Sequence, residues 1–341
     1  MAPVSLPPGQ RPPEHADVLS PIFWRGDAVV VLDQRRLPHE EVWTAYDTWE
    51  DLCRAISDME VRGAPAIGCA AAFATALAWR ANPSVFALRA AMKAIGASRP
   101  TAVNLGAAVH RIANAITGER DPLDEARAFW DEDLAACRAI GAHGAALVPD
   151  GAVVLTHCNA GALATAGYGT ALGIVRAAVA AGKKVRVLAG ETRPWLQGAR
   201  LTAWELAQDG IPCEVIVDGA AAHFLSRGDV QLAIVGADRI ARNGDVANKI
   251  GTAGVAAACH AFGVPFVVAA PRTTLDPALE TGAKIVLEER GPEEVTHVRG
   301  VPTVAPGTAV RNPVFDVTPA RFVTAIVTDE GVARPPFAFI V

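Results

Sequence analysis

The sequence predicts an α/β protein in which a mainly helical N-terminal domain with a small β-hairpin precedes a Rossmann-like domain built on a doubly wound parallel sheet. From about residue 48 to residue 145, apolar residues recur at spacings of three and four, as packed amphipathic helices require. From residue 152 onward, short runs rich in Val, Ile and Leu alternate with stretches of helical length, which indicates βαβ units. The turn signal at 149–151 separates the two regions. We therefore expect an N-terminal arm at 1–20, a helical domain at 21–148 and a Rossmann-like catalytic domain at 149–341.

Each expected element has its own signal in the sequence. The alternating stretch 22–34 carries Gly26 and Asp27 between two β-prone pieces, which is typical of a hairpin. Apolar periodicity then predicts five helices, and continuous apolar runs predict five buried strands. The helices are expected at 48–59, 64–81, 85–99, 104–117 and 123–147, and the strands at 152–157, 184–190, 212–217, 230–236 and 265–270.

The composition excludes several classes of protein. The chain has 341 residues, which is enough for two domains because single cores stop growing near roughly 250–300 residues. A formal net charge of -5 disfavours a nucleic-acid partner. Apolar runs are interrupted by Gly or Pro, so we expect no membrane-spanning segment.

The cysteine pattern and the N-terminus bear on compartment and metal binding. Six cysteines lie far apart without a Cys-x-x-Cys pair, which argues against a disulfide framework and a zinc site and predicts reduced thiols. The proline-rich N-terminus lacks the basic and apolar stretches of a signal peptide and is typical of a flexible arm. We expect a cytoplasmic protein.

Polar residues follow the predicted parallel strands at their carboxyl ends, where ligands bind in such sheets. Cys158 ends the first strand, at a point where the sequence predicts that the strand passes into a helix of small residues. A thiol at a helix N-terminus has a lowered pKa and is reactive, whereas a lone cysteine is more often an inert core residue. His157 precedes it, and strand alternation points this side chain away from Cys158, so we interpret it as scaffold.

Asp238 follows the apolar run of the fourth predicted strand. A carboxylate there is an N-cap, a partner of Arg239 or Lys249, or an acid kept protonated in a dry site. The stretch 236–252 also places Asn248, Lys249 and Gly251 ahead of a helix, an arrangement that suits an anion.

The helical domain contains two arginines just ahead of predicted helix starts. Arg62 and Gly63 precede Ala64 and Pro65, which favours anion capture by a guanidinium and free backbone N–H groups; the alternative is a plain helix start with a solvated arginine. Arg99 and Pro100 repeat the pattern ahead of Thr101, and two such arginines suggest a phosphate ligand. No P-loop or dinucleotide fingerprint is present, so we expect no nucleotide cofactor.

Five ordered motifs closely resemble the S-methyl-5-thioribose-1-phosphate isomerase family, and the resemblance covers nearly the whole chain. This family is related to ribose-1,5-bisphosphate isomerases and to the regulatory subunits of translation initiation factor 2B, which lack the catalytic cysteine and aspartate. The motifs are "RGAPAIG" (62–68), "SRPTAVNL" (98–105), "THCNAGALAT" (156–165), "ETRPWLQGARLTAWEL" (191–206) and "GADRIARNGDVANKIGT" (236–252).

The resemblance implies an aldose–ketose isomerase of methionine salvage that forms a homodimer and needs no metal, and we expect no cofactor. It implies that Asp238 donates a proton and that Cys158 assists hydrogen transfer. It also implies a sugar-phosphate site made of Arg62, Gly63, Ala64, Arg99, Gln197, Asn248 and Lys249. The alternatives are isomerisation of 5-deoxyribose 1-phosphate or ribose 1,5-bisphosphate, and a non-catalytic regulatory subunit. A methylthio group needs an apolar wall, to which Trp195 or Trp24 would contribute.

Overall fold

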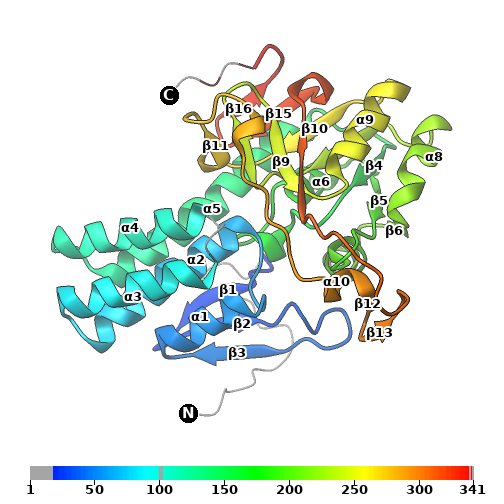
Figure 1. Ribbon diagram of the computed structural model, residues 1–341. Helices are drawn as coiled ribbons and strands as arrows, with labels where there is room; N and C mark the ends of the chain where they lie inside the picture. Colours follow the sequence, from blue (N-terminus) through cyan, green and yellow to red (C-terminus); the bar gives the residue numbers. More distant parts are fainter. Residues whose placement is uncertain (1–17, 100–102, 338, 340–341) are drawn as a thin grey trace. The chain divides into compact units, whose positions relative to one another are not determined.

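The computed structural model describes residues 18–99, 103–337 and 339 (Figure 1). The chain divides into two compact units. Of the described residues, the first unit contains those up to Arg138 together with Ala160–Gly173, and the second contains Ala139–Asn159 together with those from Ile174 onward. Each unit is described by itself. The predicted domain boundary at residue 149 stays a prediction.

The first unit contains a three-stranded antiparallel sheet of β1 (Ile22–Arg25), β2 (Ala28–Leu32) and β3 (Trp43–Tyr46), in that order. The predicted hairpin is confirmed, because β1 and β2 are antiparallel and join at Gly26 and Asp27. The third strand was not predicted. It pairs only with β2, and its four residues are too few to show a strand pattern in the sequence.

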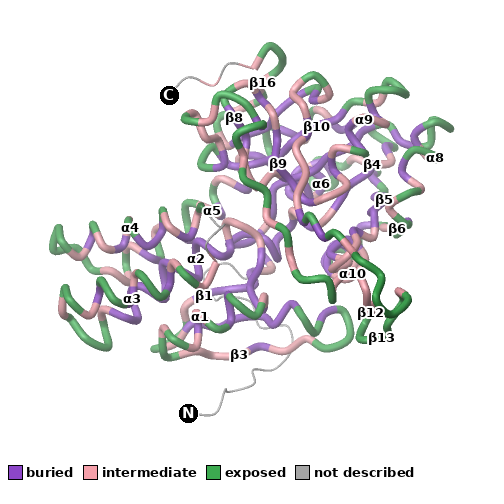
Figure 2. The backbone as a smooth tube through the Cα atoms, in the orientation of Figure 1, coloured by how far each residue is buried: buried purple, intermediate pink, exposed green. Residues whose placement is uncertain are grey.

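The predicted helices of this region are confirmed, and α2 is central to their packing. It contacts α1, α3 and α4, and every residue from Ala66 to Ala78 is buried (Figure 2). Among the described residues α2 is the one helix whose length and composition would allow it to cross a membrane, yet 72% of it is buried in the protein, as in a core helix. The helices are α1 (Trp49–Ser57), α2 (Ala64–Ala81), α3 (Val85–Ser98), α4 (Val103–Thr117) and α5 (Pro122–Ala145).

The second unit is built on a seven-stranded sheet in the order β6-β5-β4-β7-β10-β15-β16. All neighbouring strands are parallel except β15 and β16, so the predicted Rossmann-like fold is confirmed. The strands are β4 (Val153–Thr156), β5 (Arg186–Gly190), β6 (Cys213–Ile216), β7 (Leu232–Val235), β10 (Phe266–Ala269), β15 (Ala325–Thr328) and β16 (Gly331–Ala333).

The strand order reverses between β4 and β7. From β4 the chain continues to β5 and β6 on one side, and from β7 it continues to β10 on the other. This is the topological switch point, where ligands bind in doubly wound sheets. The helices of this unit are α6 (Ala171–Ala180), α7 (Ala203–Gln208), α8 (Ala221–Ser226) and α9 (Thr252–Phe262).

Smaller elements of the second unit were not predicted. A four-stranded sheet has the order β11-β8-β9-β14, and a two-stranded sheet follows the short helix α10. These strands have two to four residues each, which is too few to show a strand pattern in the sequence. Their bounds are β8 (Arg239–Ala241), β9 (Val246–Lys249), β11 (Leu275–Asp276), β14 (Phe315–Thr318), α10 (Glu293–Thr296), β12 (His297–Val298) and β13 (Val301–Pro302).

The expected passage from the first parallel strand into a helix is wrong. After β4 the chain makes only the short 3-10 turn Ala162–Ala164 before α6 begins at Ala171. The small residues between Cys158 and Ala171 form a compact loop instead. In this loop the carbonyl of Ala160 accepts hydrogen bonds from the backbone N–H groups of Thr170 and Leu172. Cys158 therefore does not stand at the N-terminus of an α-helix.

Candidate active site

Cys158 and Asp238 follow the two strands that meet at the switch point. Val154 pairs with Leu232 and Leu155 with Ala233, so the carboxyl ends of β4 and β7 emerge side by side. Cys158 comes two residues after the end of β4, and Asp238 comes three residues after the end of β7. The sheet thus brings the two ends that carry the predicted catalytic residues to one place in the fold.

The backbone of Cys158 is fixed on both sides. Its φ of 62° lies in the left-handed region, which costs a residue with a side chain roughly 1–2 kcal/mol. Its N–H donates to Thr192 Oγ1 at 2.8 Å, and its carbonyl accepts from Thr202 Oγ1 at 2.7 Å. Such a conformation persists only where the surroundings determine it, and it marks functional sites.

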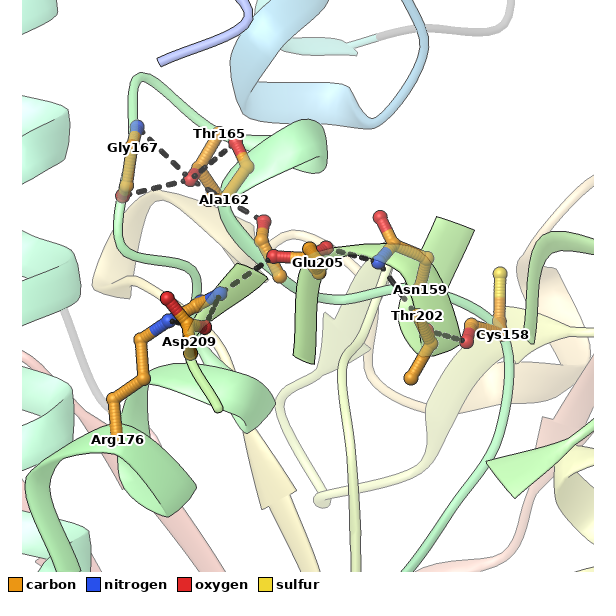
Figure 3. A network of polar contacts seen from close by, with 10 residues as sticks. Cys158, Asn159, Ala162, Thr165, Gly167, Arg176, Thr202, Glu205 and Asp209 are labelled. Atoms are coloured by element: carbon orange, nitrogen blue, oxygen red, sulfur yellow. Dashed lines mark hydrogen bonds and ion pairs between the residues drawn. The ribbon is translucent and has the colours of Figure 1, made fainter. Parts of the chain in front are cut away.

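A buried polar network continues from this point, as Figure 3 shows. Asn159 donates from Nδ2 to Thr202 Oγ1 at 3.2 Å and to Glu205 Oε1. Glu205 is fully buried and accepts from Arg176 Nη2 at 2.9 Å. Arg176 also pairs with Asp209 at 2.6 Å. The sequence analysis missed Arg176, Thr202, Glu205 and Asp209, since none of them stands at a strand end.

His157 is part of the scaffold, as predicted. Its ring is 2% exposed, and Nε2 lies 2.7 Å from the carbonyl oxygen of Ile250. Burial lowers the pKa of the imidazole, which is therefore neutral near pH 7 and donates from Nε2. The ring links the end of β4 to the turn that follows β9.

Asp218 is a further residue that the sequence analysis missed. It follows β6, and its carboxylate accepts the backbone N–H groups of Thr192 at 2.8 Å and Arg193 at 2.7 Å. The carboxylate thereby shapes the loop whose Thr192 hydroxyl binds Cys158. The signal was available, because Asp218 ends the third predicted strand at the same sheet edge.

Asp238 is half-buried, and one of its three predicted roles is excluded. The strand β8 follows it and no helix does, so it is not an N-cap. Its backbone N–H donates to the carbonyl of Ala247 at 2.9 Å, which sets the start of the β8–β9 hairpin. The guanidinium of Arg239 pairs with Asp276 at 3.6 Å.

Asn248 and Lys249 lie at the end of β9 and are both 6% exposed. Asn248 donates from Nδ2 to Thr252 Oγ1 at 3.1 Å. Lys249 Nζ lies 4.1 Å from the centre of the Phe315 ring, within the range of a cation–π contact.

The N-terminus of α9 follows these residues, as predicted, but an internal carboxylate occupies it. Asp316 Oδ2 accepts the N–H of Gly251 at 2.7 Å, and Asp316 also accepts the N–H of Ala253 at 3.2 Å. Burial raises the pKa of Asp316 to about 6, against the effect of these hydrogen bonds and of Lys249. We expected this helix N-terminus to be open to a ligand anion. For the N–H groups of Gly251 and Ala253 this expectation is wrong, because Asp316 already accepts both.

Gln197 stands at the start of a π-helical segment, Gly198–Thr202. It is 5% exposed, and its Oε1 atom has no hydrogen-bond partner among the described residues. A buried amide oxygen without a partner is rare and costs free energy. Gln197 is therefore suited to meet a ligand donor.

The remaining predicted binding residues belong to the first unit. Arg62 is 7% exposed, and Gly63 is the N-cap of α2, whose first residue is Ala64. Gly63 has a φ of +91°, and a Cβ atom there would lie 2.5 Å from the carbonyl oxygen of Ala164, so only glycine fits. Arg99 is half-buried at the end of α3. Pro100 and Thr101, which complete its predicted pattern, lie outside the described residues.

The two tryptophans suggested for an apolar wall have other contacts. The guanidinium of Arg200 lies 4.2 Å from the centre of the Trp195 ring. Trp24 packs against Phe73 with a centroid distance of 6.0 Å. Within the described parts of the chain, no group of three or more His, Cys, Asp or Glu residues is placed to hold a metal ion.

Comparison with known proteins places these features in context. The model of the Initiation factor 2 subunit family matches residues 60–335. The methylthioribose-1-phosphate isomerase of Geobacter sulfurreducens is 54% identical over 326 residues, covering 91% of this chain and 94% of that protein. The crystal structure of 5-methylthioribose 1-phosphate isomerase from Pyrococcus horikoshii is 41% identical, with a TM-score of 0.88 and 93% of each chain covered. The crystal structure of the delta subunit of translation initiation factor 2B from A. fulgidus is 43% identical, with a TM-score of 0.84, and covers 94% of this chain and 97% of that one.

Proposed function

The chain belongs to the Initiation factor 2 subunit family and, within it, to the methylthioribose-1-phosphate isomerases, and we propose that it converts 5-methylthioribose 1-phosphate to 5-methylthioribulose 1-phosphate in methionine salvage. The observation that carries this proposal is the identity of 54% to a named isomerase over nine-tenths of both chains. The presence of Cys158 and Asp238 after adjacent strands supports it and disfavours a non-catalytic regulatory subunit.

Asp238 acts as the acid that opens the sugar ring. The anomeric carbon of the substrate carries phosphate, so the sugar has no free aldehyde, and the bond from C1 to the ring oxygen must break with protonation of that oxygen. An aspartic acid does this near neutral pH only if its pKa is raised from about 3.9. The buried apolar strand that precedes Asp238 supports this role.

Cys158 assists the transfer of hydrogen from C2 to C1. In one route a base removes the C2 proton, an enol phosphate forms, and C1 is protonated. In the other, hydride moves directly from C2 to C1 while the C2 hydroxyl loses its proton and becomes the carbonyl. A thiolate serves the first route as base, and a neutral thiol serves the second by binding the C2 oxygen.

A set of charged and polar residues is proposed to hold the phosphate, and its binding energy fixes the reacting carbons. The candidates are Arg62, Gly63, Ala64, Arg99, Gln197, Asn248 and Lys249. Support comes from the burial of Arg62, Gln197, Asn248 and Lys249, from the glycine-only conformation of Gly63 and from the buried amide oxygen of Gln197.

The enzyme is proposed to act as a cytoplasmic homodimer without a cofactor. The family resemblance supports the dimer, and the six widely spaced cysteines without a Cys-x-x-Cys pair support the compartment. Sedimentation analysis of the purified protein tests the first point, because a monomer at micromolar concentration contradicts it. Activity in the soluble fraction of fractionated cells tests the second.

Turnover of three sugars on one preparation tests the function. Phosphorus NMR follows the loss of 5-methylthioribose 1-phosphate, 5-deoxyribose 1-phosphate and ribose 1,5-bisphosphate and the appearance of each ketose. We expect the highest kcat/KM for the methylthio sugar and a smaller value for the 5-deoxy sugar, because one small apolar group changes binding by about 1–3 kcal/mol. The absence of turnover with all three contradicts the proposal. Deuterium at C2 separates the routes, because hydride transfer retains it at C1 in the product.

A further inference from the structure

We propose that Thr202 is a positioning residue that holds Cys158 in its left-handed backbone conformation, and that the buried Glu205–Arg176 pair fixes Thr202 and Asn159 in place. The proposal deepens the function proposed above, because it rests on Cys158 taking part in the isomerisation.

The contacts of Cys158 form a clamp on its backbone. The Thr192 hydroxyl accepts the Cys158 N–H at 2.8 Å, and the Thr202 hydroxyl donates to the Cys158 carbonyl at 2.7 Å. The two threonines reach it from opposite ends of the stretch 191–206. Because φ and ψ set the direction of the Cα–Cβ bond, this clamp determines where the thiol points.

Local structure places the Thr202 hydroxyl. The segment Gly198–Thr202 is π-helical, a form that occurs in single turns and often at functional sites. A side chain at Gly198 would collide with the carbonyl oxygen of Gly190, so the segment lies directly against the end of β5. Its last residue, Thr202, is thereby brought to the end of β4.

The buried polar network holds Asn159, the neighbour of Cys158, against Thr202 (Figure 3). Asn159 Nδ2 donates to Thr202 Oγ1 at 3.2 Å and to the carboxylate of Glu205, which is fully buried. Arg176 balances the Glu205 charge at 2.9 Å. Moving a buried charged pair out of place costs free energy, because its hydrogen bonds would be lost without compensation from water. Asn159, the residue after Cys158, is therefore held in position by its hydrogen bond to Glu205.

The test replaces the hydroxyl without changing the shape of the side chain. Thr202→Val removes the donor to Cys158, Thr202→Ser retains it, and Thr75→Val is the matched control. Thr75 is also fully buried and donates to a backbone carbonyl, that of Ala71 at 2.8 Å, but it lies within α2. Melting temperature, kcat, KM and the rate of Cys158 alkylation by iodoacetamide, followed by peptide mass spectrometry, are measured for each variant.

We expect Thr202→Val to lower kcat about tenfold or more with KM within about twofold, since one lost hydrogen bond to a positioned group changes a rate by this order. We expect it to change the alkylation rate of Cys158 at least threefold, and we expect Thr202→Ser to restore both quantities. Thr75→Val should leave both unchanged whatever it does to the melting temperature. If Thr202→Val does not fold, Thr202→Ala takes its place.

A kcat within twofold of wild type in the folded Thr202 variant overturns the proposal. So does failure of Thr202→Ser to restore activity. If the wild-type enzyme turns over none of the three sugars, the proposed function is wrong. The positioning role of Thr202 is then tested by the alkylation rate of Cys158 alone. In that case a changed rate in Thr202→Val that Thr202→Ser restores supports it, and an unchanged rate overturns it.

Discussion

Lys249 and Phe315 face each other as register partners of the antiparallel strands β9 and β14, and the lysine ammonium lies 4.1 Å from the centre of the ring. The aromatic face attracts the cation, and the lysine is almost entirely buried. Phe315 therefore limits the positions that the Lys249 side chain can take. A phosphate that binds Lys249 meets an ammonium group whose rotamer freedom is already reduced.

Replacement of Phe315 by leucine should weaken phosphate binding. A cation–π contact contributes about 0.5–2 kcal/mol, so Phe315→Leu should raise KM about two- to thirtyfold with little change in kcat, and Phe315→Tyr should restore it. The matched control is Phe322→Leu, because Phe322 also lies under a cation, Arg321, at 4.6 Å. Steady-state kinetics with inorganic phosphate as competitor provides the measurement. An equal rise of KM in both leucine variants contradicts the assignment.

Asp316 should make stability depend on pH in a defined direction. Its pKa is about 6 in the folded protein against 3.8 for a free aspartate, so the folded state binds more protons between these values. Its contribution to stability is complete below about pH 3.8 and is lost as pH rises through about 6. The melting temperature of Asp316→Asn relative to wild type should therefore increase from pH 4.5 to pH 7.5. Parallel curves for the two proteins would show that the carboxyl titrates normally.

Removal of either proposed catalytic group should abolish most turnover without unfolding the protein. Asp238→Asn and Cys158→Ser each remove a proton-transfer group worth roughly 10²–10⁴-fold in rate. Phosphorus NMR of substrate and ketose measures the loss, and circular dichroism confirms that each variant is folded. Near-normal activity of purified Asp238→Asn would exclude that residue as the acid.

Gly63 should tolerate a side chain far less well than another glycine of positive φ. Gly63→Ala introduces both a disfavoured backbone and a contact with Ala164, so we expect a loss of about 2–4 kcal/mol in unfolding free energy. Gly26 has a φ of +59° and open space around its Cα, and Gly26→Ala should cost about 1 kcal/mol. Denaturant unfolding compares the two, and equal losses contradict the close approach of Ala164.

The sequence could predict the fold because its long elements have clear periods. The helices around α2 and the strands β4, β5, β7 and β10 show their spacing over many residues or as buried apolar runs. The β8–β9 hairpin could not be predicted in this way. Its two strands have three and four residues, too few to show a period, and its register depends on the distant strand β14.

The candidate site was predictable where residues stand at strand ends, as Cys158 and Asp238 do. The sequence analysis missed residues that contact a candidate site residue or its neighbour from a distant part of the chain. Glu205 contacts Asn159 and Phe315 contacts Lys249, and no local sequence pattern encodes such tertiary contacts. The predicted effect of a helix N-terminus on Cys158 failed because the following helix begins only at Ala171.

The pairing of β4 with β7 also has a consequence for how the enzyme folds. Val153 donates its N–H to the side chain of Gln231 at 2.9 Å, across 78 positions of sequence. Contacts between such distant parts of a chain close a long loop and form late, whereas local helices form early. We therefore expect the switch point to be among the last regions to assemble. During refolding, the alkylation rate of Cys158 should reach its native value only as this central strand pair closes.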